Sequence, residues 1–293
     1  MAFRIASHYA REAQYRVIEH HRRQFGVKTM CAVLGVSRAA YYVWRQRSQA
    51  PDRDAARLAL VQEAYQRSHR TYGYRRITLR LQRQHRINHK AVLRLMQKAG
   101  LASIARRRRV QTSGAAAHPA HRYANVLQRE FTAAAPNQKW VTDVTYVHTQ
   151  QGWAYLATIK DLFDGFIVAY TLGRHNSVAL VTQTVQRALA NEKVTAGLIL
   201  HSDQGQQYSS QPYFALMQEY TIVPSMSRRG NCWDNAPMEN FFGHLKAEAL
   251  HHVKQPSFTE LAALIENYLY FYNYERLQLK TKQTPFERRR LFL

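Results

Sequence analysis

Three strand-like segments separated by short turns constrain the fold of this chain more than any other feature. Residues 140–148 alternate apolar and polar side chains, and residues 153–159 and 166–172 repeat the strand composition after turns at 150–152 and 161–165. Turns this short join neighbouring strands in antiparallel order. We therefore expect an antiparallel meander at the start of a sheet.

The chain then alternates between helices and strands. Ser177 precedes a helical spacing of apolar residues, and the apolar run 197–201 follows as a fourth strand. A strand reached through a helical crossover lies parallel to a strand already in the sheet. A helix at 213–219, a short strand at 222–224 and a helix from Pro237 to about His251 complete the pattern. The predicted fold class is α/β, a mixed five-stranded sheet of the ribonuclease-H-like type.

Three acidic residues in this half occupy positions where a solvated charge is not normally placed. Asp143 lies within the first strand, Asp203 directly after the fourth, and Glu239 in the first turn of the later helix. If the fourth strand lies beside the first, the three carboxylates converge and repel one another unless a cation neutralises them. Such oxygen ligands favour Mg²⁺ or Mn²⁺, and we expect two ions ~4 Å apart, a clamp suited to phosphodiester displacement.

Lys246 follows Glu239 by two helical turns, so we expect it on the same helix face and in contact with a phosphate beside the metals. A single lysine on a helix is otherwise more often solvent-exposed. Asp203 could instead be a turn residue, and Glu239 could favour a helix N-terminus. The other acids nearby are assigned structural roles in turns and loops: Asp161, Asp164 and Asp234.

The net charge of +23 is concentrated at one end of the chain. Residues 1–110 hold 25 Lys and Arg against 5 Asp and Glu, whereas residues 111–293 hold 17 against 14. Charge that serves solubility alone would be spread evenly. The uneven distribution indicates that the basic half binds a polyanion through phosphate contacts, and we expect DNA.

Two helical groups in the basic half have the spacing of DNA-binding modules. Residues 27–34 and 38–47 are predicted helices on either side of a Gly35–Ser37 turn, which is the helix-turn-helix arrangement, although an ordinary helical hairpin is the alternative. A second group with helices near 58–65, 74–81 and 88–99 resembles a winged or helix-turn-helix module. The basic residues expected on outer faces, toward DNA, are Arg38, Arg45, Arg75, Arg76, Arg80, Arg83, Arg86, Lys90 and Arg94, with the run 106–109.

Residues 111–135 are rich in Ala, His, Ser, Gly and Pro and are predicted to be a linker, within which Tyr123, Leu127 and Phe131 keep a helical spacing. Cys31 and Cys232 show no metal-ligand or disulfide pattern. No apolar run reaches the ~18–20 residues of a membrane span, and the N-terminus has no signal-peptide core. We expect a cytoplasmic protein.

The segments around the acids resemble the integrase-core DDE transposases, and in particular the second-reading-frame (OrfB) proteins of the bacterial family-three insertion sequences. Asp203 and Glu239 have 35 residues between them, the separation typical of that family. Gln204 stands where the family usually has a basic residue, and the zinc-binding His/His/Cys/Cys domain of retroviral integrases is missing. The matching segments are 140–146, 201–205, 227–246 and 272–276 in the acidic half, and 34–38 and 69–77 in the basic half.

The resemblance implies metal-dependent cleavage of DNA at the element ends, followed by transfer of a 3′-hydroxyl into target DNA. It also implies a homo-oligomer on DNA and a first-reading-frame partner protein or a frameshift fusion. The implied domains are a helix-turn-helix module at 1–50, a second helical module at 51–110, the linker at 111–135, and an integrase-type core with a helical tail at 136–293.

Three alternatives remain open at the level of sequence. A ribonuclease-H-type nuclease would share the acids but would not need two helical modules before them. A non-catalytic DNA-binding regulator would not need the acids. A decayed transposase is the third, although Asp143, Asp203 and Glu239 and their flanking residues are intact.

Overall fold

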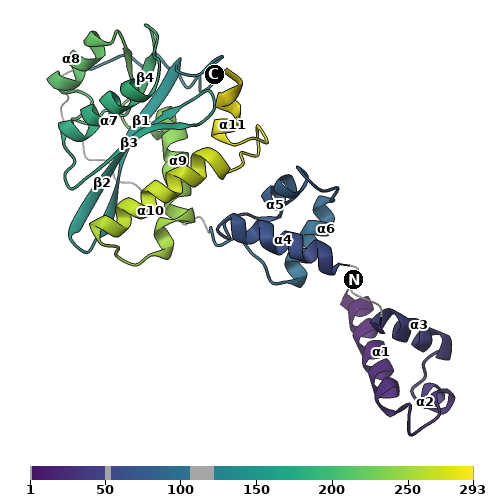
Figure 1. The fold of residues 1–293 in the computed structure, drawn as a ribbon. Coiled ribbons are helices and arrows are strands. Elements are labelled where there is room, and N and C mark those ends of the chain that lie inside the picture. Colours follow the sequence, from purple (N-terminus) through teal and green to yellow (C-terminus); the bar gives the residue numbers. More distant parts are fainter. Residues whose placement is uncertain (1, 50–53, 106–121, 293) are drawn as a thin grey trace. The chain divides into compact units, whose positions relative to one another are not determined.

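The structure, a computed structural model, describes residues 2–49, 54–105 and 122–292 (Figure 1). The chain divides into two compact units, Met1–Leu60 and Val61–Leu293, and each is described by itself. The predicted domain boundaries at residues 50, 110 and 135 stay a prediction. The arginine run 106–109 lies outside the described residues.

The first unit is a small helical cluster. Helices α1 (Ala2–His21), α2 (Val27–Val33) and α3 (Arg38–Gln49) surround the buried side chains of Ile18, Cys31 and Tyr41. Gly35 has a φ of 65°, the left-handed conformation that a glycine adopts most easily after a helix. Ser37 Oγ accepts a hydrogen bond from Ala40 N at 3.4 Å at the start of α3. The predicted pair of helices and the glycine turn between them are confirmed.

Three further helices precede the sheet: α4 (Ala55–Arg67), α5 (Tyr74–Leu81) and α6 (His89–Lys98). Asn88 caps α6, because its side chain accepts a hydrogen bond from Lys90 N at 2.9 Å. The buried apolar residues of these helices are Val61, Tyr65, Ile77, Leu81, Val92, Leu95 and Met96.

The second unit contains a mixed sheet of five strands in the order β3-β2-β1-β4-β5. Strand β1 pairs antiparallel with β2, and β2 pairs antiparallel with β3, whereas β1 with β4 and β4 with β5 are parallel. Both the meander and the parallel fourth strand are confirmed. The strand bounds are β1 Lys139–Thr149, β2 Gly152–Asp161, β3 Ile167–Gly173, β4 Ile199–Ser202 and β5 Val223–Met226.

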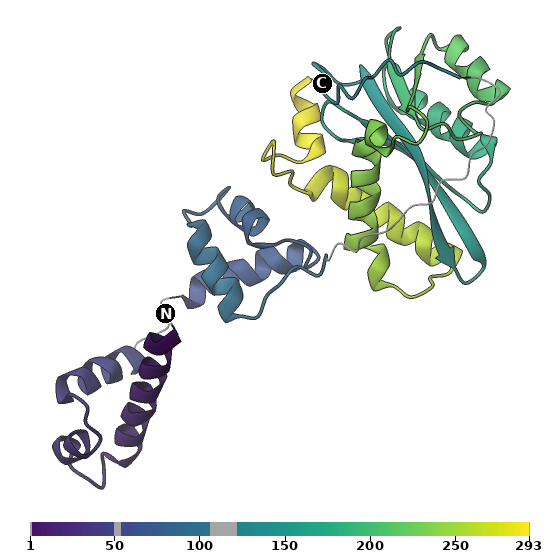
Figure 2. The ribbon, with the colours of Figure 1, turned by 180° about the vertical axis from the view of Figure 1, so that it is seen from behind.

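Helices cover both faces of this sheet (Figures 1 and 2). Helices α7 (Val178–Asn191) and α8 (Gln211–Glu219) pack on one face, over a core that includes Trp140, Leu200 and Met217. Helices α9 (Ala236–Glu248) and α10 (Phe258–Tyr270) lie on the other face. The remaining helical segments are a π turn at Phe271–Glu275, α11 at Pro285–Arg289, and 3₁₀ turns at Cys232–Asn235, Leu250–His252 and Arg290–Phe292.

The described end of the predicted linker lies along strand β5. Ala124 O accepts a hydrogen bond from Met226 N at 3.2 Å, and Leu127 N donates one to Ser225 Oγ at 3.1 Å. The helical spacing of apolar residues here forms no helix, because Leu127 is buried against the core in irregular backbone. Across the described part of the chain, none of the helices is long and apolar enough to cross a membrane.

Candidate active site

Asp143 and Asp203 lie at matching positions along two neighbouring parallel strands. Strands β1 and β4 pair through Lys139 with Ile199, Trp140 with Leu200, and Val141 with His201. The same register, continued by two residues along each chain, brings Asp143 opposite Asp203, just beyond the end of β4. The sequence prediction that these two acids become neighbours therefore agrees with the observed strand order.

Backbone amides orient the two carboxylates. Val144 N donates a hydrogen bond to Asp143 Oδ1 at 2.8 Å, and Gly205 N donates one to Asp203 Oδ1 at 2.9 Å. Each bond uses one oxygen of its carboxylate, so the second oxygen is available to a ligand.

Two hydrogen bonds hold the start of α9, which carries Glu239, against the sheet. The side-chain amide of Asn235 donates to the carbonyl of Thr142 at 3.1 Å, and Lys160 Nζ donates to the carbonyl of Pro237 at 3.3 Å. Thr142 directly precedes Asp143. The first turn of α9 is therefore fastened beside the strand position of the first acid.

The charges at this edge of the sheet act on one another. Burial raises the pKa of Asp143 well above its ordinary value, and the charges of Asp203 and Glu239 raise it further, whereas Lys246 lowers it. Burial also raises the pKa of Asp203 and Glu239, although both side chains keep exposed surface. Burial lowers the pKa of Lys246 against the opposing effect of Asp143. Lys246 thus offsets only part of the negative charge of three carboxylates.

Lys246 is half-buried on the predicted face of α9. Its Nζ lies 5.5 Å from the centroid of the Tyr146 ring, a cation–π contact that holds the amine beside β1. Tyr146 itself is 57% exposed, so this end of the site is open to a large ligand.

Carboxylate oxygens at the edge of a sheet are suitable ligands for a hard divalent cation. Within the described ranges, however, no three His, Cys, Asp or Glu side chains stand in metal-ligand geometry. The three acids are gathered at one edge but are not closed around a single point. Their convergence on a metal stays a prediction.

Two residues of this site escaped the sequence interpretation. Tyr208 is buried, its hydroxyl lies 3.3 Å from Thr142 Oγ1, and burial together with the charges of Asp143 and Asp203 raises its pKa well above the ordinary value. A Cβ on Gly205 would lie 3.0 Å from Asp203 Oδ1, so a larger residue would disturb that carboxylate. The Asp-x-Gly spacing is a signal for Gly205, whereas nothing in the sequence pattern distinguishes Tyr208.

The acids that were assigned structural roles have protein partners. Asp161 accepts hydrogen bonds from Asn137 N at 2.7 Å and Phe163 N at 2.8 Å. Asp164 pairs with Arg289 at 2.9 Å. Asp234 pairs with Arg129 at 2.7 Å and Arg228 at 2.8 Å, and it fastens the segment 122–131 to the loop before α9. These structural roles are confirmed.

The arginines chosen as DNA contacts divide into two groups. Arg38 and Arg75 are exposed, as predicted. The outward orientation is wrong for Arg45, whose Nε lies 3.2 Å from Glu19, and for Arg76, whose Nη1 lies 4.0 Å from Glu248. It is also wrong for Arg80, whose guanidinium lies over the ring of Tyr72, 5.8 Å from the centroid. Arg83 is exposed, as predicted, and pairs with Glu287 at 2.7 Å.

Arg45 and Arg76 turn inward because each finds a carboxylate on another helix, which helical periodicity does not reveal. Gln204, in place of the family's basic residue, donates from its side-chain amide to the carbonyl of Ser227 at 3.0 Å.

Comparison with known proteins matches the same halves of the chain. Residues 133–232 and 239–292 match family models described as integrase core domain, and residues 51–109 match an HTH-like domain. A 31 kDa protein of insertion element IS600 from Shigella sonnei is 38% identical over 250 residues, 84% of this chain and 92% of the relative. The transposase InsF of insertion sequence IS3A from Escherichia coli K12 is 35% identical over 261 residues, 87% of this chain and 90% of the relative.

The chain belongs to the IS3 family of insertion-sequence transposases.

This transposase is also similar to solved retroviral integrases. The catalytic core domain of HTLV-2 integrase in complex with magnesium is 18% identical, with a TM-score of 0.43, and the match covers 53% of this chain and 97% of that one. A simian T-cell lymphotropic virus intasome in complex with a PP2A regulatory subunit is 17% identical, with a TM-score of 0.46, and the match covers 77% and 73% of the two chains.

Family membership confirms the predicted fold class and the predicted reaction. The transposase has an integrase catalytic core preceded by helices, and its chemistry is DNA cleavage followed by strand transfer. The nuclease and regulator alternatives are thereby set aside.

Proposed function

We propose that Asp143, Asp203 and Glu239 hold two Mg²⁺ or Mn²⁺ ions at which the transposase cuts and joins DNA, with Lys246 in contact with a phosphate. The observation that supports this most directly is the register of β1 and β4, which runs on to Asp143 and Asp203. The bonds of Asn235 and Lys160 that hold the first turn of α9 support the inclusion of Glu239.

The donor set fits this kind of ion. All three side chains are carboxylates. Burial first, and then the charges of Asp203 and Glu239, raise the pKa of Asp143, and a bound cation would offset both effects. When bound, a pair of such ions supplies an activated nucleophile and stabilises the leaving oxygen of a phosphodiester.

The residues of the chain orient and surround these ligands. The amides of Val144 and Gly205 fix one oxygen of Asp143 and Asp203, respectively. Tyr208 is buried beside the site, with its hydroxyl 3.3 Å from Thr142 Oγ1 and close enough to Asp143 and Asp203 for their charges to raise its pKa. Lys246 stays beside Tyr146 at the open end, where an incoming phosphate would meet its charge.

The basic half supports a role in bringing DNA to this site. The exposed guanidinium groups of Arg38 and Arg75 are suited to phosphate contacts. We propose that the transposase works in the bacterial cytoplasm as a homo-oligomer on the element ends, with a first-reading-frame partner or fusion. Such a partner would add to the end recognition that the helical modules of this chain provide.

The test is Mg²⁺-dependent cleavage and joining of DNA that carries the element ends. We expect the variants Asp143→Asn, Asp203→Asn and Glu239→Gln to lose at least about 10³-fold in rate, because each removes a ligand while leaving the volume unchanged. Lys246→Gln should lose about 10–100-fold through a weaker phosphate contact. Glu219→Gln, a change at an exposed acid on α8, is the matched control and should retain full activity.

Full activity in any one of the three acid variants would contradict the proposed metal site. Cleavage without joining would return the nuclease interpretation. DNA binding that is insensitive to a chelator, with no cleavage even after the first-reading-frame partner is added, would return the regulator.

A further inference from the structure

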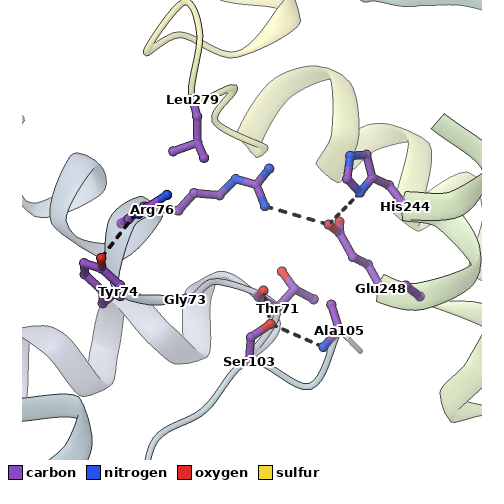
Figure 3. Close-up of a pocket in the computed structure, with 11 residues that line it drawn as sticks. Thr71, Gly73, Tyr74, Arg76, Ser103, Ala105, His244, Glu248 and Leu279 are labelled. Carbon is purple, nitrogen blue, oxygen red and sulfur yellow. Dashed lines mark hydrogen bonds and ion pairs between the residues drawn. The ribbon is translucent and has the colours of Figure 1, made fainter. Parts of the chain in front are cut away.

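A pocket of about 440 Å³ lies near the far end of α9, away from Glu239. Figure 3 shows Arg76 reaching across it from the start of α5 toward His244 and Glu248 on α9, with Ser103 and Leu279 at its margins. Arg75 also lines it. The pocket therefore joins the segment that matches an HTH-like domain to the catalytic core.

The one carboxylate in this pocket is already fully engaged. Arg276 donates to the two oxygens of Glu248 at 2.6 and 2.8 Å, a bidentate pair. Tyr268 adds a third hydrogen bond to Glu248 at 3.0 Å. Burial of the pair is nearly complete, with 3% of the Glu248 side chain and 4% of the Arg276 side chain exposed. Arg276 alone balances the charge of Glu248.

Arg76 is a second cation at the same carboxylate, but it makes no hydrogen bond to Glu248. Its Nη1 lies 4.0 Å from Glu248, beyond hydrogen-bond distance, and its buried Nε has no hydrogen-bond partner. Its guanidinium lies over the ring of Tyr72, 5.6 Å from the centroid. Burial and the nearby charge of Arg276 lower the pKa of Arg76. Because Arg276 already balances the charge of Glu248, the charge of Arg76 is left over, and this excess favours an added anion.

The mouth of the pocket carries more positive charge. Arg75 is exposed, and its Nε donates to the hydroxyl of Tyr74 at 3.2 Å, which holds the guanidinium beside the opening. His244 Nδ1 lies 3.6 Å from Glu248 on the opposite wall. The pocket thus holds one neutralised carboxylate and two further arginines, Arg75 and Arg76.

We propose that this pocket binds a backbone phosphate of DNA, held by Arg75 and Arg76, and so links the DNA on the helical modules to the catalytic core. A guanidinium group donates two parallel hydrogen bonds to a pair of phosphate oxygens. An open pocket of this size admits one phosphate while the DNA duplex stays outside. The proposal rests on the proposed function only in that its ligand is the same DNA. It does not depend on the metal ligands.

The test measures DNA affinity against salt concentration in the full chain, without metal and in an Asp143→Asn background. Arg76→Gln should make the salt dependence shallower by about one unit of slope and weaken binding by roughly three- to tenfold, equally on element-end DNA and on unrelated DNA. Arg76→Lys, which keeps the charge but loses the planar fork, should fall between. The matched control is Arg187→Gln, an exposed arginine on α7, and its slope should stay unchanged.

A second variant separates ligand binding from ion pairing inside the protein. If Arg76 serves only to pair with Glu248, then Glu248→Gln and Arg76→Gln should weaken DNA binding alike, and the proposal fails. If the pocket takes a phosphate, Glu248→Gln removes a repulsive charge, and DNA binding should stay equal or tighten. Thermal unfolding of each variant identifies any that has lost its fold, and Arg76→Lys then carries the comparison.

An unchanged salt slope in Arg76→Gln would overturn the proposal, even if affinity falls. Titration with inorganic phosphate provides the other arm: loss of phosphate binding in Arg76→Gln with an unchanged DNA slope would make the pocket a free-anion site and overturn the DNA assignment. Because no metal is present, either outcome is independent of whether the three acids catalyse cleavage.

Discussion

The two ends of helix α9 carry opposite charge imbalances. At its start, Glu239 joins Asp143 and Asp203, and Lys246, from the last turn of the helix, offsets only part of their charge. At its end, Glu248 is neutralised by Arg276, and Arg76 is a further cation beside it. Negative charge is in excess at one end and positive charge at the other. An imbalance of this kind in a half-buried site indicates the sign of the ligand, here a metal cation and a phosphate.

The contributions of Glu248 and Asp143 to the free energy of unfolding should change with pH in opposite directions. The pKa of Glu248 is lowered, chiefly by the hydrogen bond and charge of Arg276 acting against burial. Its contribution to stability is therefore present above the ordinary pKa of a glutamate and is lost as the pH falls through the lowered value. The pKa of Asp143 is raised, so ionisation of Asp143 destabilises the metal-free fold as the pH rises through the raised value.

The largest expected effect is at the buried pair. Arg276→Met should lower the free energy of unfolding by about 3–5 kcal/mol, because Glu248 would remain as a buried charge whose bidentate partner is lost. Urea unfolding followed by circular dichroism measures the loss. The double variant Arg276→Met, Glu248→Gln should recover part of it, because the uncompensated charge is gone. A single variant as stable as the wild type would mean that Arg76 can neutralise Glu248, and that the positive excess is smaller than the contacts indicate.

A smaller effect of opposite sign is expected at the first acid. Asp143→Asn should raise the stability of the metal-free transposase by roughly 1 kcal/mol, because it removes a charge that burial and Asp203 disfavour. Added Mg²⁺ at ~10 times its Kd should stabilise the wild type by about 1.4 kcal/mol and the variant much less.

Thermal unfolding between pH 7.5 and 5 checks both statements. The wild type without metal should gain stability as the pH falls toward the ordinary pKa of an aspartate (~3.9), and Asp143→Asn should lack most of that gain. A variant less stable than the wild type, without metal, would show that the carboxylate contributes a structural hydrogen bond worth more than its charge costs.

The acids could be located from the sequence because strand order carries information over long distances. A helical crossover required the fourth strand to be parallel, and its pairing with β1 then fixed Asp143 and Asp203 together although sixty positions separate them. Helix ends could also be predicted, because they depend on local contacts. Gly35 adopts the left-handed conformation after α2, and the side chains of Asn88 and Ser177 accept hydrogen bonds from the first turns of α6 and α7.

The arginines could not be placed in the same way. Periodicity indicates which residues of a helix are polar, but it does not tell whether a polar face meets water or another segment. Arg76 and Arg83 reach Glu248 and Glu287, which lie far along the chain and follow no repeat. The buried position of Tyr208 near the acids could not be predicted either, because residues in loops follow no periodic pattern.

The smallest expected effect tests the same contrast within the first unit. Arg38 is exposed at the start of α3, whereas Arg45 is held by Glu19, whose other contacts are Arg22 and the hydroxyl of Tyr41. Arg38→Gln should weaken DNA binding by about threefold and make the salt slope shallower by about one unit. Arg45→Gln should change the slope less and instead cost about 0–1 kcal/mol of stability, since a partly exposed ion pair contributes little. Fluorescence anisotropy across a salt series measures the first quantity and thermal unfolding the second. Equal salt slopes for the two variants would show that Arg45 leaves Glu19 and contacts DNA. An ion pair within the protein would then not tell which arginines are excluded from DNA binding.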